Sequence, residues 1–165
     1  MKSLHATCLI IGLFSTFHAF SQSDVLKWSK LSEAEINLQI TKLDSSASAV
    51  ILGECQSINV QYGNIIMQNH VRLKILNRNG LEHANVTLPY YIKDDLEKIT
   101  SVKAQTINIL PGGKLEKTEI KGSEVFTIDV NENWKAKKFT FPAVKEGSHY
   151  RIYILKNIKG LFKSG

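Results

Sequence analysis

The feature that most restricts the fold of this chain is an alternation of apolar and polar residues with a period of two, which begins at Ala49. It is clearest in segment 67–76, where aliphatic residues alternate with basic ones: Val71, Leu73 and Ile75 against His70, Arg72 and Lys74. Successive side chains of a strand point to opposite faces of its sheet. The pattern therefore predicts strands with one face against a core.

Further strands with the same period are expected at 84–88, 99–110, 126–130, 139–141 and 150–154. Turn signals separate these strands, and no helical pattern lies between them. Such an arrangement favours antiparallel sheets over a parallel α/β fold. We therefore predict a mainly β protein, an antiparallel β-sandwich.

Turn residues and strand-breaking residues separate the predicted strands. Asn79-Gly80 predicts a tight hairpin in which 84–88 returns alongside 67–76, because Asn and Gly accept positive φ angles. The Pro-Gly-Gly sequence at 111–113 predicts another turn. Pro89 is expected to interrupt the strand pattern, as are the two aspartates that follow it at 94–95.

One short helix is expected ahead of the strands, at about 33–43. Ser32 followed by Glu35 has the spacing of a capping box. Apolar residues then recur at helical spacing: Ile36, Ile40 and Leu43. The chain of 165 residues, 43% hydrophobic and 22% charged, has the size and composition of a single domain.

The N-terminal segment has the features of a cleavable signal peptide. Lys2 precedes the apolar run 8–14, and Ala19 and Ser21 provide small residues for a peptidase. A spanning helix needs about 20 apolar residues, so the run is too short to cross a membrane. We expect a protein exported to the periplasm or beyond, with no stable membrane anchor after cleavage.

These patterns divide the chain into four parts. We expect a signal peptide at 1–21, a helical lead-in at 22–44, the sandwich domain at 45–155 and a polar tail at 156–165.

Cys55 would be the only cysteine left after the signal peptide is removed, so no internal disulfide is expected. Nucleophilic catalysis by Cys55 would need a histidine base and a third group to orient it. Cys55 instead follows the apolar run 49–52, which favours a packed or idle thiol. A thiol enzyme is kept as the weaker alternative.

Other chemistry is not indicated. The sequence has no phosphate-binding glycine loop, paired-cysteine zinc pattern or nucleophile elbow. The histidines after the leader, His70, His83 and His149, are not spaced as metal ligands. The net charge of +6 is spread over segments such as 135–138 and 156–163, so nucleic acid is not an expected partner. We expect no cofactor, no metal and no enzymatic activity.

Three aromatic residues remain as candidate contacts: Tyr90, Tyr91 and Trp134. If exposed, they could stack on a sugar or a peptide. The favoured interpretation is that Trp134 packs in the core and that Tyr90 or Tyr91 lies at the sheet rim, because such rings combine an apolar body with a polar tip.

Several segments together resemble a known family: 47–52, 70–82, 111–114 and 139–148. They are similar to a domain of unknown function that precedes transglutaminase-like domains in exported Bacteroidetes proteins. The resemblance implies a non-catalytic β-sandwich module with an accessory or interaction role, and it brings no catalytic residues to this chain.

Members of that family usually continue with further strands, whereas this chain ends soon after 150–155. We therefore expect a C-terminally truncated member in which 150–155 leaves an open sheet edge. Open edges invite pairing with another chain, so a protein or peptide is the expected partner.

Overall fold

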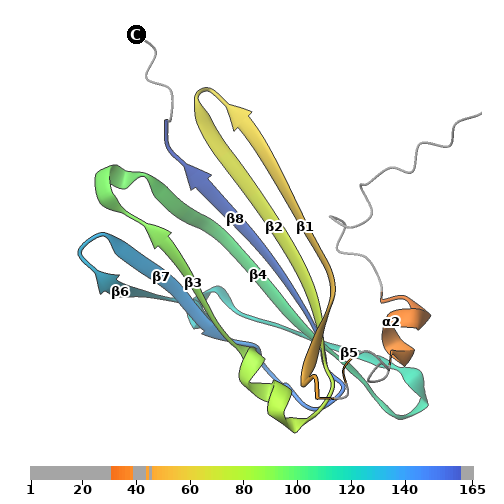
Figure 1. The fold of residues 1–165 in the computed structure, drawn as a ribbon. Helices are drawn as coiled ribbons and strands as arrows, with labels where there is room; N and C mark the ends of the chain where they lie inside the picture. The colour runs from red at the N-terminus through yellow and green to blue at the C-terminus, as the bar shows by residue number, and fades with distance from the viewer. Residues whose placement is uncertain (1–30, 39–43, 45, 161–165) are drawn as a thin grey trace, which may run out of the picture.

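The computed structural model describes residues 31–38, 44 and 46–160, and it confirms a mainly β sandwich with one short helix (Figure 1). The long strands are β1 (Ala49–Gln61), β2 (Asn64–Ile75), β4 (Glu97–Ile109) and β8 (His149–Ile158). The shorter strands are β3 (Asn85–Tyr91), β5 (Leu115–Glu119), β6 (Phe126–Asn131) and β7 (Trp134–Thr140). The helix is α2 (Glu33–Asn37), and 3-10 turns occur at η1 (Arg78–Ala84), η2 (Lys93–Asp95), η3 (Pro111–Gly113) and η4 (Gly122–Glu124).

The strands form two antiparallel sheets. The larger has the order β1-β2-β8-β4-β5, and the smaller has the order β3-β7-β6. Figure 1 shows the smaller sheet along one face of the larger, with α2 on the opposite side. Because β2 and β8 carry apolar residues toward the smaller sheet, the core lies between the two sheets.

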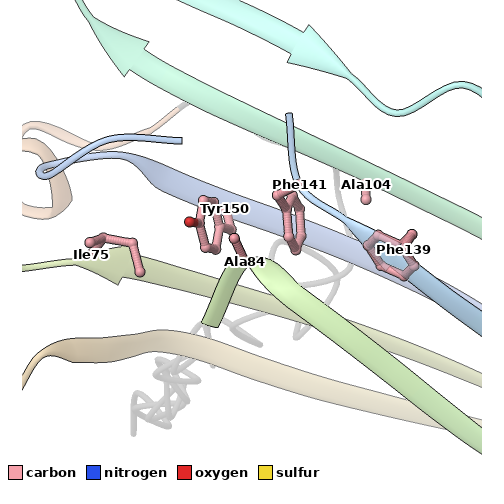
Figure 2. Packing of buried hydrophobic residues seen from close by; sticks show 6 residues of the cluster. All are labelled: Ile75, Ala84, Ala104, Phe139, Phe141 and Tyr150. Atoms are coloured by element: carbon pink, nitrogen blue, oxygen red, sulfur yellow. The ribbon is translucent and has the colours of Figure 1, made fainter. Parts of the chain in front are cut away.

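The core is a compact group of buried apolar side chains drawn from both sheets: Ile75, Ala84, Ala104, Phe139, Phe141 and Tyr150 (Figure 2). Phe141 connects two of its members. Its ring stacks on Tyr150 with the centroids 4.4 Å apart, and it meets Phe139 edge-on at 5.6 Å. Such aromatic pairs add to the free energy gained from burial alone.

The hairpin predicted at Asn79-Gly80 is wrong. Residues 78–84 form η1, which carries the chain from β2 in the larger sheet to β3 in the smaller one, where β3 pairs with β7. Gly80 is needed there for close approach, because a Cβ atom at this position would overlap the carbonyl oxygen of Ser48. The sequence pattern shows a glycine and cannot distinguish these two uses.

Pro89 does not interrupt its strand, contrary to expectation. It lies inside β3 opposite Ala136, at the edge of the smaller sheet. Proline is tolerated on an edge strand because its missing N–H can face away from the neighbouring strand. The turn at 111–113 is confirmed, with φ values of +81° at Gly112 and +80° at Gly113. The strand that follows this turn, β5, was not expected.

The open edge predicted at 150–155 is wrong. These residues lie in β8, which pairs with β2 on one side and β4 on the other. The late position of these residues in the sequence does not put them at an edge, because strand order does not follow sequence order and β8 inserts between β2 and β4. β8 also continues to Ile158, into the segment expected to be a polar tail.

The predicted capping box is confirmed at α2. Ser32 Oγ accepts a hydrogen bond from the Glu35 backbone (3.2 Å), and the Glu35 carboxylate accepts one from the Ser32 backbone (2.8 Å). The helix ends at Asn37, because Leu38 is extended. Ile40, Leu43 and the predicted signal peptide lie outside the described residues. Within the described part of the chain, no helix is long and apolar enough to span a membrane.

Candidate interaction surface

The outer face of the smaller sheet, turned away from the core, carries apolar and aromatic side chains. Strand register places them together, because Ile128 pairs with Ala136, Ala136 with Pro89, and Trp134 with Tyr91. Phe126 shares this face, two residues before Ile128. We call Pro89, Tyr91, Phe126, Ile128 and Trp134 the apolar face.

The expectation that Trp134 packs in the core is wrong, since 39% of its surface is exposed. Tyr91 meets it edge-on, with ring centroids 5.2 Å apart. Tyr90 belongs to the opposite side of β3 and is only 8% exposed. The structure therefore brings two of the three predicted aromatic contacts together and separates the third, because neighbouring strand residues point to opposite faces.

β6 forms the border of this face. Within the described residues it pairs with β7 alone, and all six of its residues are exposed. Phe126 is 62%, Ile128 38% and Val130 55% exposed. A surface hollow of about 530 Å³ lies beside Phe126 and Lys138. Another hollow, of about 410 Å³, lies away from β6, beside Tyr62 and Ile158. Edge strands are usually protected by charge, proline or a cover, and β6 carries a single charged residue, Asp129.

The other border that exposes apolar residues is β1, at the edge of the larger sheet. Ile51, Ile58 and Val60 are 58%, 59% and 58% exposed. These residues are spread along a strand of 13 residues, and the fully exposed Tyr62 follows it in the turn to β2. The three exposed apolar residues of β6 lie within a strand of only six residues, so they are more closely grouped than those of β1.

Cys55 is half-buried on β1, and its register partner on β2 is His70, which is 2% exposed. A thiol and an imidazole thus occupy directly opposite positions on the outer face of the larger sheet. The expected role of Cys55 as an idle thiol stays a prediction. Among residues 31–38, 44 and 46–160, no group of three or more His, Cys, Asp or Glu is placed to hold a metal ion.

A buried polar cluster that the sequence did not predict lies on that same outer face, beneath α2. The basic residues of β2 were expected to be one polar face of a strand, but Lys74 is only 8% exposed. Its ammonium group donates to three carbonyl oxygens at the end of α2: Glu35 (3.4 Å), Ile36 (2.8 Å) and Leu38 (2.6 Å). The alternation of basic residues on β2 was a signal, but only the position of α2 shows that they are covered.

Three further groups complete this cluster. Arg72 forms an ion pair with Glu35 (2.8 Å), and His149 Nε2 lies 3.1 Å from the Glu35 carbonyl oxygen. Arg151 is 2% exposed. Burial lowers the pKa of Lys74, His149 and Arg151, and the neighbouring Arg72 lowers that of Arg151 further. Burial alone would raise the pKa of Glu35, but hydrogen bonds from Ser32 and the two guanidinium groups lower it.

The fold defines this chain as a two-sheet antiparallel β-sandwich domain. A family model for a domain of unknown function with a solved structure, DUF3857, matches residues 62–152, and the chain belongs to this family. This confirms the resemblance found in the sequence. No curated protein matches the chain.

The fold is also similar to the crystal structure of a candidate protease from Parabacteroides distasonis. The TM-score is 0.53 and the sequence identity 9%, so the likeness concerns the fold alone. The match covers 71% of this chain and 24% of that protein. This chain therefore corresponds to about a quarter of the length of that protein.

Proposed function

We propose that this chain is a non-catalytic interaction module of an exported, transglutaminase-associated protein family, and that it binds an extended polypeptide segment along β6. The observation that carries the proposal is the strand itself, an edge whose six residues are all exposed. Three of them are large and apolar: Phe126, Ile128 and Val130.

Addition of a strand to β6 would use both its exposed edge and its exposed apolar side chains. Main-chain hydrogen bonds to an exposed edge supply affinity, and alternate side chains of the added strand supply specificity. Side chains on one side of an added strand would continue the apolar face beyond Phe126 and Ile128. The hollow beside Phe126 and Lys138 would receive a side chain of the added segment.

The source of the segment is another domain or protein of the same exported assembly. This fold accounts for 24% of the matching Parabacteroides distasonis chain, where it is accompanied by a larger remainder. By analogy, an accessory role beside other domains suits the present chain.

The test uses a display library of random twelve-residue peptides. We expect selected peptides to alternate apolar and polar residues, to protect the β6 amides from hydrogen exchange, and to bind at least tenfold more weakly to Ile128→Lys. The matched control is Ile58→Lys on the other sheet border, where Ile58 is 59% exposed against 38% for Ile128. Failure to select any peptide, or equal binding by Ile128→Lys, would overturn the proposal.

A second candidate is a glycan site on the apolar face, favoured by the exposed ring of Trp134 beside Tyr91. Sugars stack on such rings. An oligosaccharide panel should then change the tryptophan fluorescence of the chain, and Trp134→Phe should abolish the change. A panel without response removes this candidate.

Export to the periplasm or beyond is proposed from the leader-like residues 1–21. Mass spectrometry of the protein recovered from a periplasmic fraction should show a chain that begins at Gln22. Recovery of the unprocessed chain from the cytoplasm alone would contradict export.

A further inference from the structure

The buried cluster beneath α2 holds two guanidinium groups side by side. Arg72 of β2 and Arg151 of β8 are direct register partners, so their side chains leave the same face of the larger sheet. Arg151 is 2% exposed, and the Arg72 side chain retains 16% exposure. Like charges directly opposite each other destabilise a strand pair, and burial increases the effect.

Among the described residues, two acidic side chains are placed around this pair of arginines. Glu35 of α2 forms its ion pair with Arg72. The carboxylate of Glu119, on β5, accepts a hydrogen bond from Gln105 (2.9 Å), the register partner of Arg151 on β4. Lys74 adds a further cation, occupied by the carbonyl groups of α2. The described part of the cluster thus holds three permanent cations, of which Arg72 is paired with the Glu35 carboxylate, while the Glu119 carboxylate is hydrogen-bonded to Gln105.

Particular nitrogen atoms of the two arginines lack hydrogen-bond acceptors among the described residues. In the described part of the chain, Nε and Nη2 of Arg151 and Nε of Arg72 are buried and have no hydrogen-bond acceptor, and the buried acceptors Oε1 of Gln105 and Oε1 of Glu35 likewise form no hydrogen bond. Folded proteins satisfy almost all buried donors, and a buried donor without a protein acceptor is a position where a bound ion can supply one. Desolvated, unpaired guanidinium groups are among the most unfavourable cases.

We propose that Arg151 and Arg72 form a binding site for a small oxyanion, either a free ion such as sulfate or phosphate or the carboxylate of an acidic side chain. A guanidinium group presents two parallel N–H donors that match two oxygens of one such group. The bound anion would supply the second negative charge of the cluster. This site lies on the opposite side of the molecule from β6 and is independent of the function proposed above.

Access to the site lies on the side of Arg72, the more exposed of the two arginines. The neighbouring position on β1 is Gly53, the register partner of Arg72. A Cβ atom at Gly53 would lie 3.6 Å from Arg72 Nη2, in contact with the guanidinium group. Glycine at this position therefore places no side chain against that edge of the group.

The experiment titrates the chain with sodium sulfate, phosphate, acetate and the peptide acetyl-Ala-Glu-Ala-amide, at constant ionic strength set with chloride. The readout is the NMR signal of the arginine Nε–H groups, assigned with Arg151→Lys and Arg72→Lys. We expect saturable shifts at both arginines, with a dissociation constant in the millimolar range or tighter. Arg151→Lys, which keeps the charge but loses the two parallel donors, should weaken binding at least tenfold.

The control is Arg78→Lys, because Arg78 is an exposed arginine on η1. It should leave the titration unchanged. Saturation by sulfate or phosphate identifies a free-ion site, whereas saturation by acetate and the peptide alone identifies a site for an acidic side chain. Linear, non-saturating shifts with all four ligands would overturn the proposal, as would equal affinity in Arg151→Lys.

Discussion

Substitution of Phe139 by alanine tests whether the core lies between the two sheets. Phe139 is 2% exposed and packs among residues of both sheets (Figure 2). Truncation of a buried phenylalanine to alanine costs about 3–5 kcal/mol of unfolding free energy. With the edge-on contact to Phe141 also lost, we expect a loss of at least the middle of this range, about 4 kcal/mol.

The matched control is Phe126→Ala, the same chemical change on β6, which belongs to the same sheet. Phe126 is 62% exposed, so its loss should alter the free energy of unfolding by no more than about 0.5 kcal/mol. The comparison separates the effect of burial from that of removing a phenyl ring.

Urea unfolding followed by circular dichroism measures both variants. With an m-value of about 2 kcal/mol per molar urea, a loss of 4 kcal/mol lowers the midpoint by about 2 M. Phe139→Leu, with an expected loss on the order of 1–2 kcal/mol, serves if the alanine variant does not fold. Similar midpoints for Phe139→Ala and Phe126→Ala would refute the placement of the core.

Two further predictions concern the backbone and the pH response. Gly80→Ala should lower the free energy of unfolding by about 1–3 kcal/mol, because its Cβ would overlap the Ser48 carbonyl oxygen, whereas Gly122→Ala, with open space around it, should be nearly neutral in the same urea assay. Burial raises the pKa of Tyr150 to about 12 from 10.0, so the folded state holds this proton more tightly. The contribution of Tyr150 is therefore complete below pH 10 and is lost as the pH rises toward 12. Tyr150→Phe should flatten this part of the stability profile, and an unchanged alkaline decline in Tyr150→Phe would count against the assignment.

Local patterns predicted the local elements well. The alternation at 67–76 lies within β2, and Ser32 and Glu35 form the capping box expected of them. Both features depend on contacts between residues close in sequence, or on the two-residue period of a strand. The turn at 111–113 is predictable for the same reason, since glycine accepts the positive φ that the turn requires.

Predictions of which strands lie next to each other in a sheet were wrong. The pair at Asn79-Gly80 looks like a hairpin turn, but the chain crosses to the other sheet and Gly80 serves a close approach to Ser48. The segment 150–155 looked like an open edge because it comes late in the chain, and it occupies an interior position of its sheet. Pairing partners are set by long-range contacts that no short window contains.

The candidate surfaces show the same division. Tyr91 and Trp134 could be selected from the sequence as contact residues, and the pattern of β2 shows that its basic residues share one face. The sequence does not show which face of each sheet is covered by other parts of the chain. Trp134 was expected in the core and is exposed, whereas Arg151 was not selected and is almost fully buried.

The sequence by itself determined the mainly β class, the strand period and the membership of a family of domains of unknown function, because these follow from residue order along the chain. The tertiary structure alone decided that β8 lies between β2 and β4, that β6 is an exposed edge, and that α2 covers Arg72 and Lys74. Each of these depends on which segments, distant in sequence, bury one another. Residue order constrains that choice only through the free energy of the whole packed domain.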